Sequence, residues 1–410
     1  MRDNLFTFIE SVKDFIYFPK DQLIGFGAGE RWVMYPGDDF SGMQVFLDQH
    51  KGKYIFTCLS YDLKNELEEL KSENPDTIEF PLLVLWSPES VVEIHPEAFN
   101  FVQGEETVKT QDFVKLFFDK IQSETSFLNT NKLNFSSRID RETYIQSVNK
   151  VKAEIQYGNC YELNFCQEFY ADQVKDLDAL SLFGAIHQQT KAPFSVLMNF
   201  EKWSVLCFSP ERYIQKIGGR LLSQPIKGTI RRGKDETEDV ILQKNLLGDR
   251  KEVSENVMIT DLVRNDFSRI AKKGSVEVEH LCELQTFETV HHLVSSVICE
   301  VEENIPFEKI IRASFPMGSM TGAPKVSVMK LIEQYESFRR GLYAGSIGVI
   351  YPNGDFDLNV VIRSLLYNKS KEILTCSVGS AITMKSDPEN EYEECLVKVN
   401  KILQFFSGCK

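Results

Sequence analysis

The sequence predicts an α+β fold built on antiparallel strands. Strand-like runs follow one another between helical blocks, without the regular strand–helix alternation of a doubly wound parallel sheet. Two turn signals, Gly218-Gly219 and Pro352-Asn353-Gly354, lie between strand-like runs and indicate hairpins, the first with a type I′ turn. With 410 residues, 42% of them hydrophobic, the chain is long enough to bury a large core.

The first 130 residues mix short helical patterns with strand-like runs, including Lys53–Cys58 and Leu82–Trp86. The chain turns polar from about 103 to 140, which predicts a division between an N-terminal portion, 1–130, and the remainder, 131–410. Arg141–Tyr157 follows as an amphipathic stretch, so we expect a helix there.

Residues 160–230 are expected to form mostly strands. A long helical region over Thr237–Lys273 should stop at Gly274, because glycine commonly ends helices. Consecutive strands follow near the C-terminus. The last element, over Glu389–Phe406, carries apolar residues at a spacing of three to four and is predicted to be a helix.

The composition argues against several classes of protein. The chain has 46 Lys and Arg against 60 Asp and Glu, and this net charge of −14 would repel nucleic acid or an anionic membrane. Its longest strongly apolar run is about seven residues, far short of the roughly 20 that span a bilayer. With no signal-peptide pattern, and with nine cysteines but no Cys-x-x-Cys pair, the chain is expected to be cytoplasmic and reduced. Its state as monomer or homo-oligomer stays open.

Two predicted helices each carry a Glu-x-x-Glu motif, Glu252 with Glu255 and Glu391 with Glu394. A spacing of three places both carboxylates of a pair on one helical face. Glu255 shares its face with apolar residues, and a carboxylate that points toward the core needs a partner such as a hard divalent cation. Glu-x-x-Glu is also common on solvated helices, and Lys398 by default forms a surface ion pair with Glu394.

Two basic residues lie on predicted strands. Lys227 occupies an apolar strand, where a lysine can act as nucleophile or base, although an edge strand can carry a lysine that blocks aggregation. Arg363 lies in a strand-like run whose alternation places it on one polar face with Asp357 and Asn359. It could clamp a carboxylate bidentately or pair with Asp357 across strands. The backbone N–H groups around Gly379 are a weaker candidate for an anion site.

Taken together, eight segments resemble the chorismate-utilising enzymes in order and spacing. They cover roughly residues 140–405, while residues 1–130 match loosely. The segments are SPERY (209–213), QPIKGTIRRG (224–233), KEVSENVMITDLVRNDFSRI (251–270), VHHLVSSV (290–297), FPMGSMTGAPKVSVMKLIE (315–333), GLYAGSIG (341–348), DLNVVIRS (357–364) and DPENEYEECLVKVNKI (387–402). The resemblance implies an α-β-β-α sandwich of two large antiparallel sheets covered by helices, with a cleft for Mg²⁺ and chorismate.

Positions in these segments imply roles for individual residues. Glu255 and Glu394 correspond to direct ligands of Mg²⁺, and Glu252 and Glu391 to residues that hold it through water. The metal would then bridge to a chorismate carboxylate. The substrate-binding positions of the family correspond here to Arg363, Lys398, the backbone around Gly379, Tyr343 and Thr321.

Lys227 indicates which branch of the family this chain resembles. Anthranilate-forming members have Ala at this position, whereas Pro-Ile-Lys-Gly-Thr implies amination of chorismate at carbon 4, toward 4-aminobenzoate and folate. The lysine would attack carbon 2 and expel the 4-hydroxyl, and ammonia would then displace it by entering at carbon 4. Glu211 matches the family's general acid/base, and His292 matches a histidine implicated in anthranilate formation.

The resemblance also has departures and open alternatives. Glu162 stands where the isochorismate- and salicylate-forming branches have a lysine, which counts against those reactions. Gly379-Ser380-Ala381 replaces a glycine-rich segment, which would alter the backbone if Ala381 stands for a glycine with positive φ. We find no tryptophan-feedback element in 1–130 and no glutaminase-like segment, so ammonia is expected from a separate glutamine amidotransferase subunit. An anthranilate-forming enzyme and a non-catalytic scaffold remain the alternatives.

Overall fold

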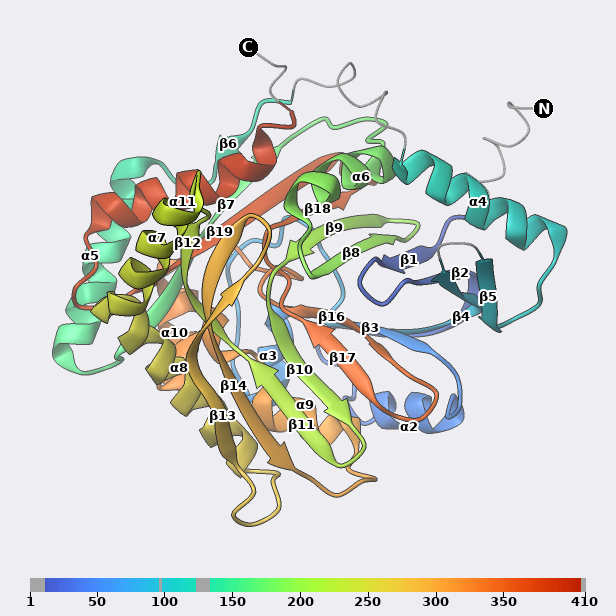
Figure 1. Cartoon of the computed structure of the whole chain (residues 1–410), viewed down its shortest axis with the longest axis horizontal. Helices are drawn as coiled ribbons and strands as arrows, with labels where there is room; N and C mark the ends of the chain where they lie inside the picture. Colours follow the sequence, from blue (N-terminus) through green and yellow to red (C-terminus); the bar gives the residue numbers. More distant parts are fainter. Residues whose placement is uncertain (1–11, 96–97, 123–132, 407–410) are drawn as a thin grey trace.

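The strands pair into one antiparallel network with two arms that meet at β4 (Leu83–His95). The computed structural model describes residues 12–95, 98–122 and 133–406 (Figure 1). From β4, the first arm runs through β2 (Leu23–Met34), β1 (Phe15–Phe18), β8 (Phe194–Asn199), β9 (Trp203–Ser209), β18 (Ser364–Asn368), β19 (Ile373–Ile382) and β7 (Glu162–Ala171), where short strands β6 (Ser136–Ser137) and β15 (Gly322–Ala323) attach.

The second arm leaves β4 on its other side. It runs through β3 (Ile55–Leu59), β16 (Ser346–Ile350), β17 (Phe356–Asn359), β10 (Arg212–Ile217), β11 (Arg220–Gln224) and β14 (Val290–Glu300), with β12 (Ile226–Arg231) and β13 (Glu277–Thr286) also on β14. The short strand β5 (Ala98–Gln103) pairs with the far half of β4.

Helices cover both arms (Figure 1). On the first arm, α5 (Arg141–Tyr157), α10 (Lys325–Tyr335) and α11 (Pro388–Leu403) contact β7 or β19, and α6 (Ala179–Thr190) contacts β8 and β9 beneath α4 (Val108–Gln122). On the second arm, α7 (Glu236–Gly248) and α8 (Arg250–Ser268) contact β12, β13 and β14, and α9 (Phe307–Ser314) contacts α8 and α2 (Gly42–Gln49). Short helical turns lie at η1 (Tyr61–Leu63), α3 (Lys64–Leu67) and η3 (Gly318–Met320). The predicted α+β sandwich is thus confirmed, with its two sheets hydrogen-bonded into one network through β4.

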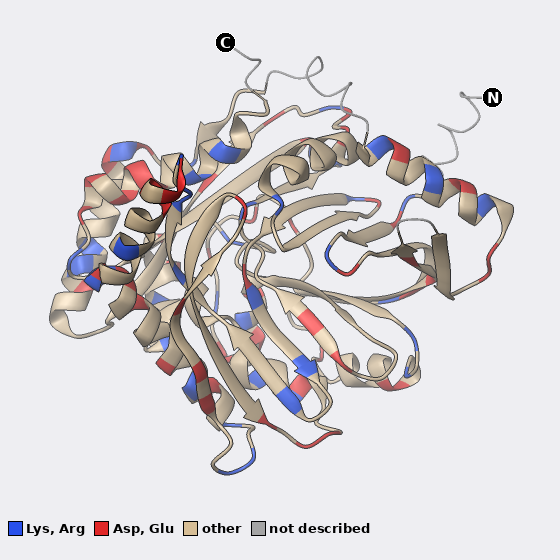
Figure 2. Ribbon diagram, in the orientation of Figure 1, with Lys and Arg blue, Asp and Glu red and all other residues tan. Residues whose placement is uncertain are grey.

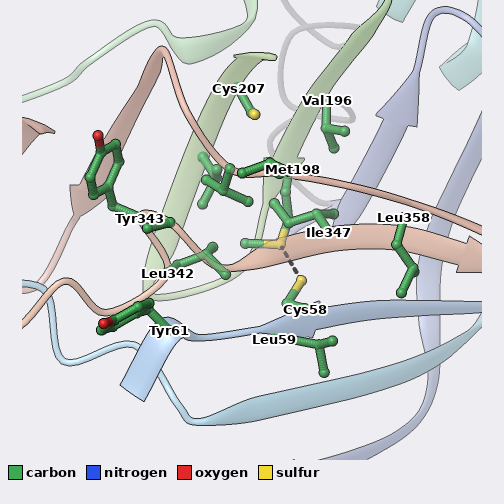
Figure 3. Close-up of a cluster of buried hydrophobic side chains, with 14 of the residues drawn as sticks. Cys58, Leu59, Tyr61, Val196, Met198, Cys207, Leu342, Tyr343, Ile347 and Leu358 are labelled. Carbon is green, nitrogen blue, oxygen red and sulfur yellow. Dashed lines mark hydrogen bonds between the residues drawn. The ribbon is translucent and has the colours of Figure 1, made fainter. Parts of the chain in front are cut away.

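The main core lies between the two arms. Figure 3 shows Cys58 and Ile347, from β3 and β16, facing Met198 and Val196 from β8. The Sγ of Cys58 lies 3.5 Å from the Sδ of Met198, so side chains of opposite arms are in direct contact. These four residues are almost completely buried. Because strand side chains alternate, the opposite sides of the same strands are free to contact the helices.

Charged residues lie mainly on the outer helices and loops. Figure 2 shows acidic and basic residues interspersed along α4, α5 and α11, with long uncharged stretches on the strands. Within the described residues, no helix is both long and apolar enough to cross a bilayer. The eight cysteines in that part of the chain form no disulfide bond with one another.

Several predicted elements are confirmed and others are wrong in detail. The helix at Arg141–Tyr157 is confirmed, and both hairpins form. Only Gly218 of the first turn has a positive φ, 55°, so that turn follows the type II′ pattern and not type I′. The strands expected over residues 160–230 are interrupted by α6, which the sequence analysis missed. The predicted division near residue 130 lies outside the described residues.

The single helix predicted over Thr237–Lys273 is wrong. It consists of α7 and α8, separated at Asp249, whose backbone is extended and whose side chain accepts hydrogen bonds from the N–H groups of Lys251 and Glu252. An aspartate in this position caps the start of a new helix. The second helix ends at Ser268, well before Gly274, which lies in the following turn with a φ of 78°.

The strand predicted to carry Arg363 is also interrupted. β17 ends at Asn359, and Arg363 lies in the break before β18 with a φ of 51°. Asp357 does not pair with Arg363, because its carboxylate accepts hydrogen bonds from Arg212 and Lys20 instead. The cross-strand ion pair is therefore wrong, and the guanidinium of Arg363 is left for another partner.

Candidate active site

A cleft of about 470 Å³ lies where β12 of the second arm approaches β19 of the first, with α8 and α11 along its sides. This volume is typical of small-molecule sites. Eleven of the twelve residues predicted for the site line it: Glu211, Lys227, Glu252, Glu255, His292, Tyr343, Arg363, Gly379, Glu391, Glu394 and Lys398. The fold therefore gathers into one cavity residues that are up to 187 positions apart (398 − 211) in the sequence.

The four glutamates enter the cleft from the first two turns of α8 and α11. Asp249 caps α8 and Asp387 caps α11, so both helices begin just before their Glu-x-x-Glu motifs. Glu255 and Glu391 are only 5% and 3% exposed. Burial raises the pKa of Glu255 to about 8, because water no longer stabilises the carboxylate. Its Oε1 is buried and makes no hydrogen bond with any described residue.

Lysines lie among these carboxylates. The Nζ of Lys251 is 2.9 Å from Glu391 Oε1 and 3.8 Å from Glu255 Oε1, so it links the two helices. Lys398 Nζ is 2.7 Å from Glu394 Oε1 and donates a hydrogen bond of 3.1 Å to the carbonyl of Gly379. Burial acts to raise the pKa of Glu394, but the neighbouring Lys398 ammonium brings it below its ordinary value.

The donor set fits a hard divalent cation in its chemistry. Mg²⁺ prefers carboxylate oxygens, and the buried Oε1 of Glu255 has an unused acceptor. In the described part of the chain, however, no three His, Cys, Asp or Glu side chains come close enough together to form a metal centre. Lys251 lies between the two motifs in this arrangement and supplies the positive charge.

Lys227 is held in β12 beside a backbone irregularity. The register between β12 and β14 shifts from Lys227 to Thr229, where Gly228 has a φ of 82°. Lys227 Nζ donates a hydrogen bond of 2.6 Å to Glu162 Oε1, and the lysine side chain is only 10% exposed. A lysine that protects an edge strand would be solvated, so the buried position disfavours that alternative. Burial acts to lower the pKa of Lys227, but Glu162 and Glu255 raise it above its ordinary value.

Arg363 supplies a cation without a protein partner in the described structure. Its guanidinium lines the cleft and makes no hydrogen bond or ion pair with any residue that the structure describes. Burial lowers the pKa of Arg363, although arginine stays charged at neutral pH. The left-handed backbone at this residue is uncommon for a side chain of this size. The cleft therefore contains a half-buried guanidinium positioned to bind a carboxylate.

Glu211 and His292 are both neutral for a large fraction of molecules near pH 7. Burial raises the pKa of Glu211 to about 7, so this carboxyl group can carry a proton under ordinary conditions. Burial lowers the pKa of His292 to about 4, and its Nδ1 lies 2.8 Å from the hydroxyl of Thr229. Of these two residues, Glu211 is thus the acid that can give up a proton near pH 7.

Two other predicted residues pack around the cleft. Tyr343 lines it and is nearly inaccessible, and burial raises the pKa of its hydroxyl well above the ordinary value. Thr321 does not line the cleft: its hydroxyl donates to the carbonyl of Met317, 3.0 Å away, and its carbonyl accepts from the N–H of Asn164. The predicted contact of Thr321 with substrate is therefore not seen in the cavity.

The Gly379-Ser380-Ala381 segment is ordinary strand. Ala381 is not among the described residues with positive φ, and it pairs with Asn164 across β19 and β7. Gly379 is needed for space, because a Cβ there would lie 2.7 Å from the Sγ of Cys166. Ser380 turns its hydroxyl to Oε2 of Glu391. The departure from a glycine-rich segment thus adds a hydrogen bond to one of the four glutamates.

The sequence analysis missed Lys251, Lys401 and the role of Glu162 as a partner. Lys401 lies three residues after Lys398 on α11, and this helical spacing was a readable signal for a second cation on the same face. Burial lowers the pKa of Lys401, and Arg363 and Lys398 add to the effect. Glu162 could not be paired with Lys227 from the sequence, since 65 positions separate them.

Comparisons with known proteins identify the family and agree with the fold. The family described as chorismate binding enzyme matches residues 8–404. The chain is 38% identical over 267 residues to aminodeoxychorismate synthase component 1 of Klebsiella aerogenes, covering 65% of this chain and 58% of that protein. It is 32% identical over 362 residues to anthranilate synthase component 1 of Aquifex aeolicus, covering 84% of this chain and 72% of that protein. The crystal structure of anthranilate synthase component I from Streptococcus pneumoniae TIGR4 superposes with a TM-score of 0.78 at 22% identity, covering 95% of this chain and 92% of that one.

Proposed function

Because this chain belongs to the family of chorismate binding enzymes, we propose that its cleft converts chorismate and ammonia to 4-amino-4-deoxychorismate. The observation that carries the proposal is the buried lysine of Pro-Ile-Lys-Gly-Thr, Lys227, which faces the cavity among carboxylates. The likeness to proteins named aminodeoxychorismate synthase component 1 supports it. The chain spans somewhat less than two thirds of those proteins, 58% of the Klebsiella aerogenes one.

Chorismate carries two carboxylates, and the cleft offers cations to bind them. Arg363 has an unpaired guanidinium, whose fork of N–H donors suits bidentate binding of one carboxylate. Lys398 and Lys401 lie on one face of α11 at the same cavity. We expect these three residues to orient the ring with carbon 2 toward Lys227 and the 4-hydroxyl toward Glu211.

The reaction then needs a nucleophile and an acid. The Nζ of Lys227 forms a bond to carbon 2, the ring double bonds shift, and the bond from carbon 4 to its hydroxyl oxygen breaks. Glu211 gives its proton to the departing oxygen, which leaves as water. Ammonia then bonds to carbon 4, the double bonds shift back, and the bond from carbon 2 to Lys227 breaks. His292, neutral and hydrogen-bonded to Thr229, would line the pocket beside the ring.

We propose Mg²⁺ as the cofactor, held by Glu252, Glu255, Glu391 and Glu394. The carboxylate donor set and the Oε1 of Glu255, which accepts no hydrogen bond from a described residue, support the proposal. Bound there, Mg²⁺ would neutralise the carboxylates and attract a carboxylate of the substrate. Ser380, Lys251 and Lys398 orient three of the four glutamates through the contacts described above.

We further propose that ammonia comes from a glutamine amidotransferase subunit. The relatives are named component 1 of aminodeoxychorismate synthase. This name supports the proposal, because it indicates that those proteins act together with a second component. The expected location is the cytoplasm, where cysteines stay reduced.

Anthranilate synthesis is the second candidate, because a relative with that name matches over a longer stretch of the chain. Product identification separates the two. The protein is incubated with chorismate, Mg²⁺ and an ammonium salt, and the mixture is analysed by chromatography and mass spectrometry before and after addition of an aminodeoxychorismate lyase. We expect 4-aminobenzoate only after the lyase is added. Anthranilate formed without the lyase would refute the proposed function, and no turnover of chorismate would favour a non-catalytic scaffold.

A further inference from the structure

The pair of Glu162 and Lys227 joins the two arms of the fold at the cleft. Glu162 is the first residue of β7 in the first arm, and Lys227 belongs to β12 in the second. The side chain of Glu162 is 1% exposed, and its Oε1 lies 2.6 Å from Lys227 Nζ. Glu162 is not among the residues that line the cavity, so it contacts the cleft through Lys227.

Lys227 has to lose a proton before it can react, because an ammonium has no lone pair. In the described structure, Glu162 is the sole hydrogen-bond partner of the Nζ atom. The other nearby carboxylates, Glu211 and Glu255, act on Lys227 through space and form no ion pair within 4.0 Å of it. A proton that leaves Nζ along an existing hydrogen bond therefore moves to Glu162.

Two features make Glu162 a suitable acceptor. Its second oxygen, Oε2, is buried and has no hydrogen-bond partner among the described residues, so this oxygen is free to take a proton. A buried ion pair also carries a large desolvation penalty. Transfer of the proton from Nζ to the carboxylate removes both charges at once and leaves a neutral pair in a low-dielectric environment.

We propose that Glu162 accepts the proton of Lys227 and so releases the amine that attacks chorismate. The inference rests on the proposed function. It gives Glu162 two roles, to position the lysine and to hold its proton. The proton moves from Nζ to Glu162, and the neutral amine bonds to carbon 2 as the bond from carbon 4 to oxygen breaks. When ammonia displaces the lysine, the amine leaves with its electron pair and Glu162 returns the proton, which restores the ion pair.

The test compares Glu162→Gln with a matched control on the same strand. Glutamine keeps the shape and a carbonyl that can accept the lysine hydrogen bond, but it cannot take a proton. Glu168→Gln is the control, because Glu168 is also buried in β7 and pairs with Arg138 at 2.6 Å, outside the cleft. Circular dichroism and melting temperature establish that both variants are folded.

Steady-state kinetics with saturating ammonium give the first readout. For Glu162→Gln we expect kcat to fall by about 10²- to 10⁴-fold, as for loss of a general base, with the KM for chorismate changed by less than about twofold. The residual rate should rise with pH, because solvent must then remove the proton. Glu168→Gln should keep the wild-type kcat and pH profile. A Glu162→Gln enzyme at least as fast as wild type would overturn the inference, since Glu162 would then only hold Lys227 in its unreactive form.

The second readout needs no turnover. Reductive methylation of Lys227 with formaldehyde, quantified by peptide mass spectrometry from pH 6 to 10, reports the fraction of free amine. We expect Glu162→Gln to be labelled at lower pH than wild type, because the carboxylate of Glu162 raises the pKa of Lys227 and its removal lowers that pKa. Glu168→Gln should match wild type. Identical labelling curves for Glu162→Gln and wild type would overturn the inference even if the enzyme is active. Failure of wild type to form 4-amino-4-deoxychorismate would refute the proposed function, and the labelling curves would still decide the pairing.

Discussion

Glu211 connects burial of a single side chain to the pH dependence of the proposed reaction. The carboxyl group needs a proton to protonate the leaving hydroxyl, and burial raises its pKa to about 7. The active acid form predominates below that pH and is lost as the pH rises through it. We therefore expect kcat/KM for chorismate to decrease above about pH 7, with about a tenfold loss per pH unit at the alkaline limit.

A variant with a neutral side chain shows how much Glu211 contributes to this pH dependence. Glu211→Gln cannot donate a proton to the leaving oxygen, so its residual activity should lack the decline that wild type shows above pH 7. The measurement is kcat/KM from pH 5.5 to 9 for both proteins. If the alkaline decline persists unchanged in Glu211→Gln, another residue carries the proton.

Lys401 is a residue whose position suggests a contact with substrate that the motifs did not assign. It shares the cavity with Arg363 and Lys398 but has no ion pair with any described residue. An accessible charge of this kind is worth about 1 kcal/mol, so Lys401→Ala should raise the KM for chorismate by roughly fivefold and leave kcat nearly unchanged. Lys244→Ala, on the exposed side of α7, is the control and should keep the wild-type KM. Equal KM values for the two variants would remove Lys401 from the binding site.

At the scale of elements, Asp249 sets where the first Glu-x-x-Glu motif points. It caps α8 after a one-residue break, and Gly228 of β12 lies close to the Glu252 side chain. Asp249→Ala removes an N-cap, worth about 1 kcal/mol, and frees the first turn that carries Glu252. We expect a melting temperature lower by about 1–3 °C together with a several-fold higher Mg²⁺ requirement.

A second cap provides the control for this prediction. Asp140 caps α5 by accepting from the N–H of Thr143, 2.8 Å away, and α5 carries none of the residues that line the cleft. Asp140→Ala should lower the melting temperature by a similar amount and leave the Mg²⁺ requirement as in wild type. A Mg²⁺ requirement unchanged in Asp249→Ala as well would show that the cap does not position the metal ligands.

The elements also show what local sequence can predict. The helix α5 was predicted within its bounds from its amphipathic pattern, and the structure adds a local signal at each end, the Asp140 cap and Gly158 with a φ of 84°. The break at Asp249 was missed although an aspartate cap was present, because the segments on both sides of it are helices. The break before Arg363 has no local signal: β17 ends where its register with β10 shifts, and that pairing joins residues about 145 positions apart.

The candidate site was predicted largely through motif resemblance and only partly through residue chemistry. The spacing of the four glutamates predicted that each pair lies on one face of its helix. The fold brings both helix faces to one cavity. The contacts that modify their chemistry are long-range. Lys251 pairs with Glu391 across 140 positions and Lys227 with Glu162 across 65, so their pKa directions follow from the tertiary fold and not from the neighbouring sequence.

At the scale of the whole molecule, the net charge of −14 makes binding of a dianion depend on local cations. The acidic residues on the outer helices are interspersed with basic ones, so the cleft itself decides the local field (Figure 2). There, Glu252, Glu255, Glu391 and Glu394 face Lys251, Lys398, Lys401 and Arg363, and Lys251 and Lys398 are already engaged by the glutamates. Lys227 is likewise engaged by Glu162, so Arg363 and Lys401 are the cleft cations without an ion pair to a described residue, and they would have to attract chorismate past four carboxylates.

Added Mg²⁺ should therefore strengthen chorismate binding. We expect isothermal titration calorimetry to give a Kd for chorismate at least about tenfold weaker in EDTA than in millimolar Mg²⁺, since one divalent cation offsets two of the carboxylate charges. Glu255→Gln combined with Glu394→Gln should abolish this dependence on Mg²⁺ and, because it removes two negative charges, bind chorismate in EDTA at least as well as wild type does. Glu279→Gln, on an exposed part of β13, should keep the full Mg²⁺ effect of the wild-type protein. The same Kd for wild type with Mg²⁺ and with EDTA would contradict the metal site, because the unmodified carboxylates would then not oppose the substrate.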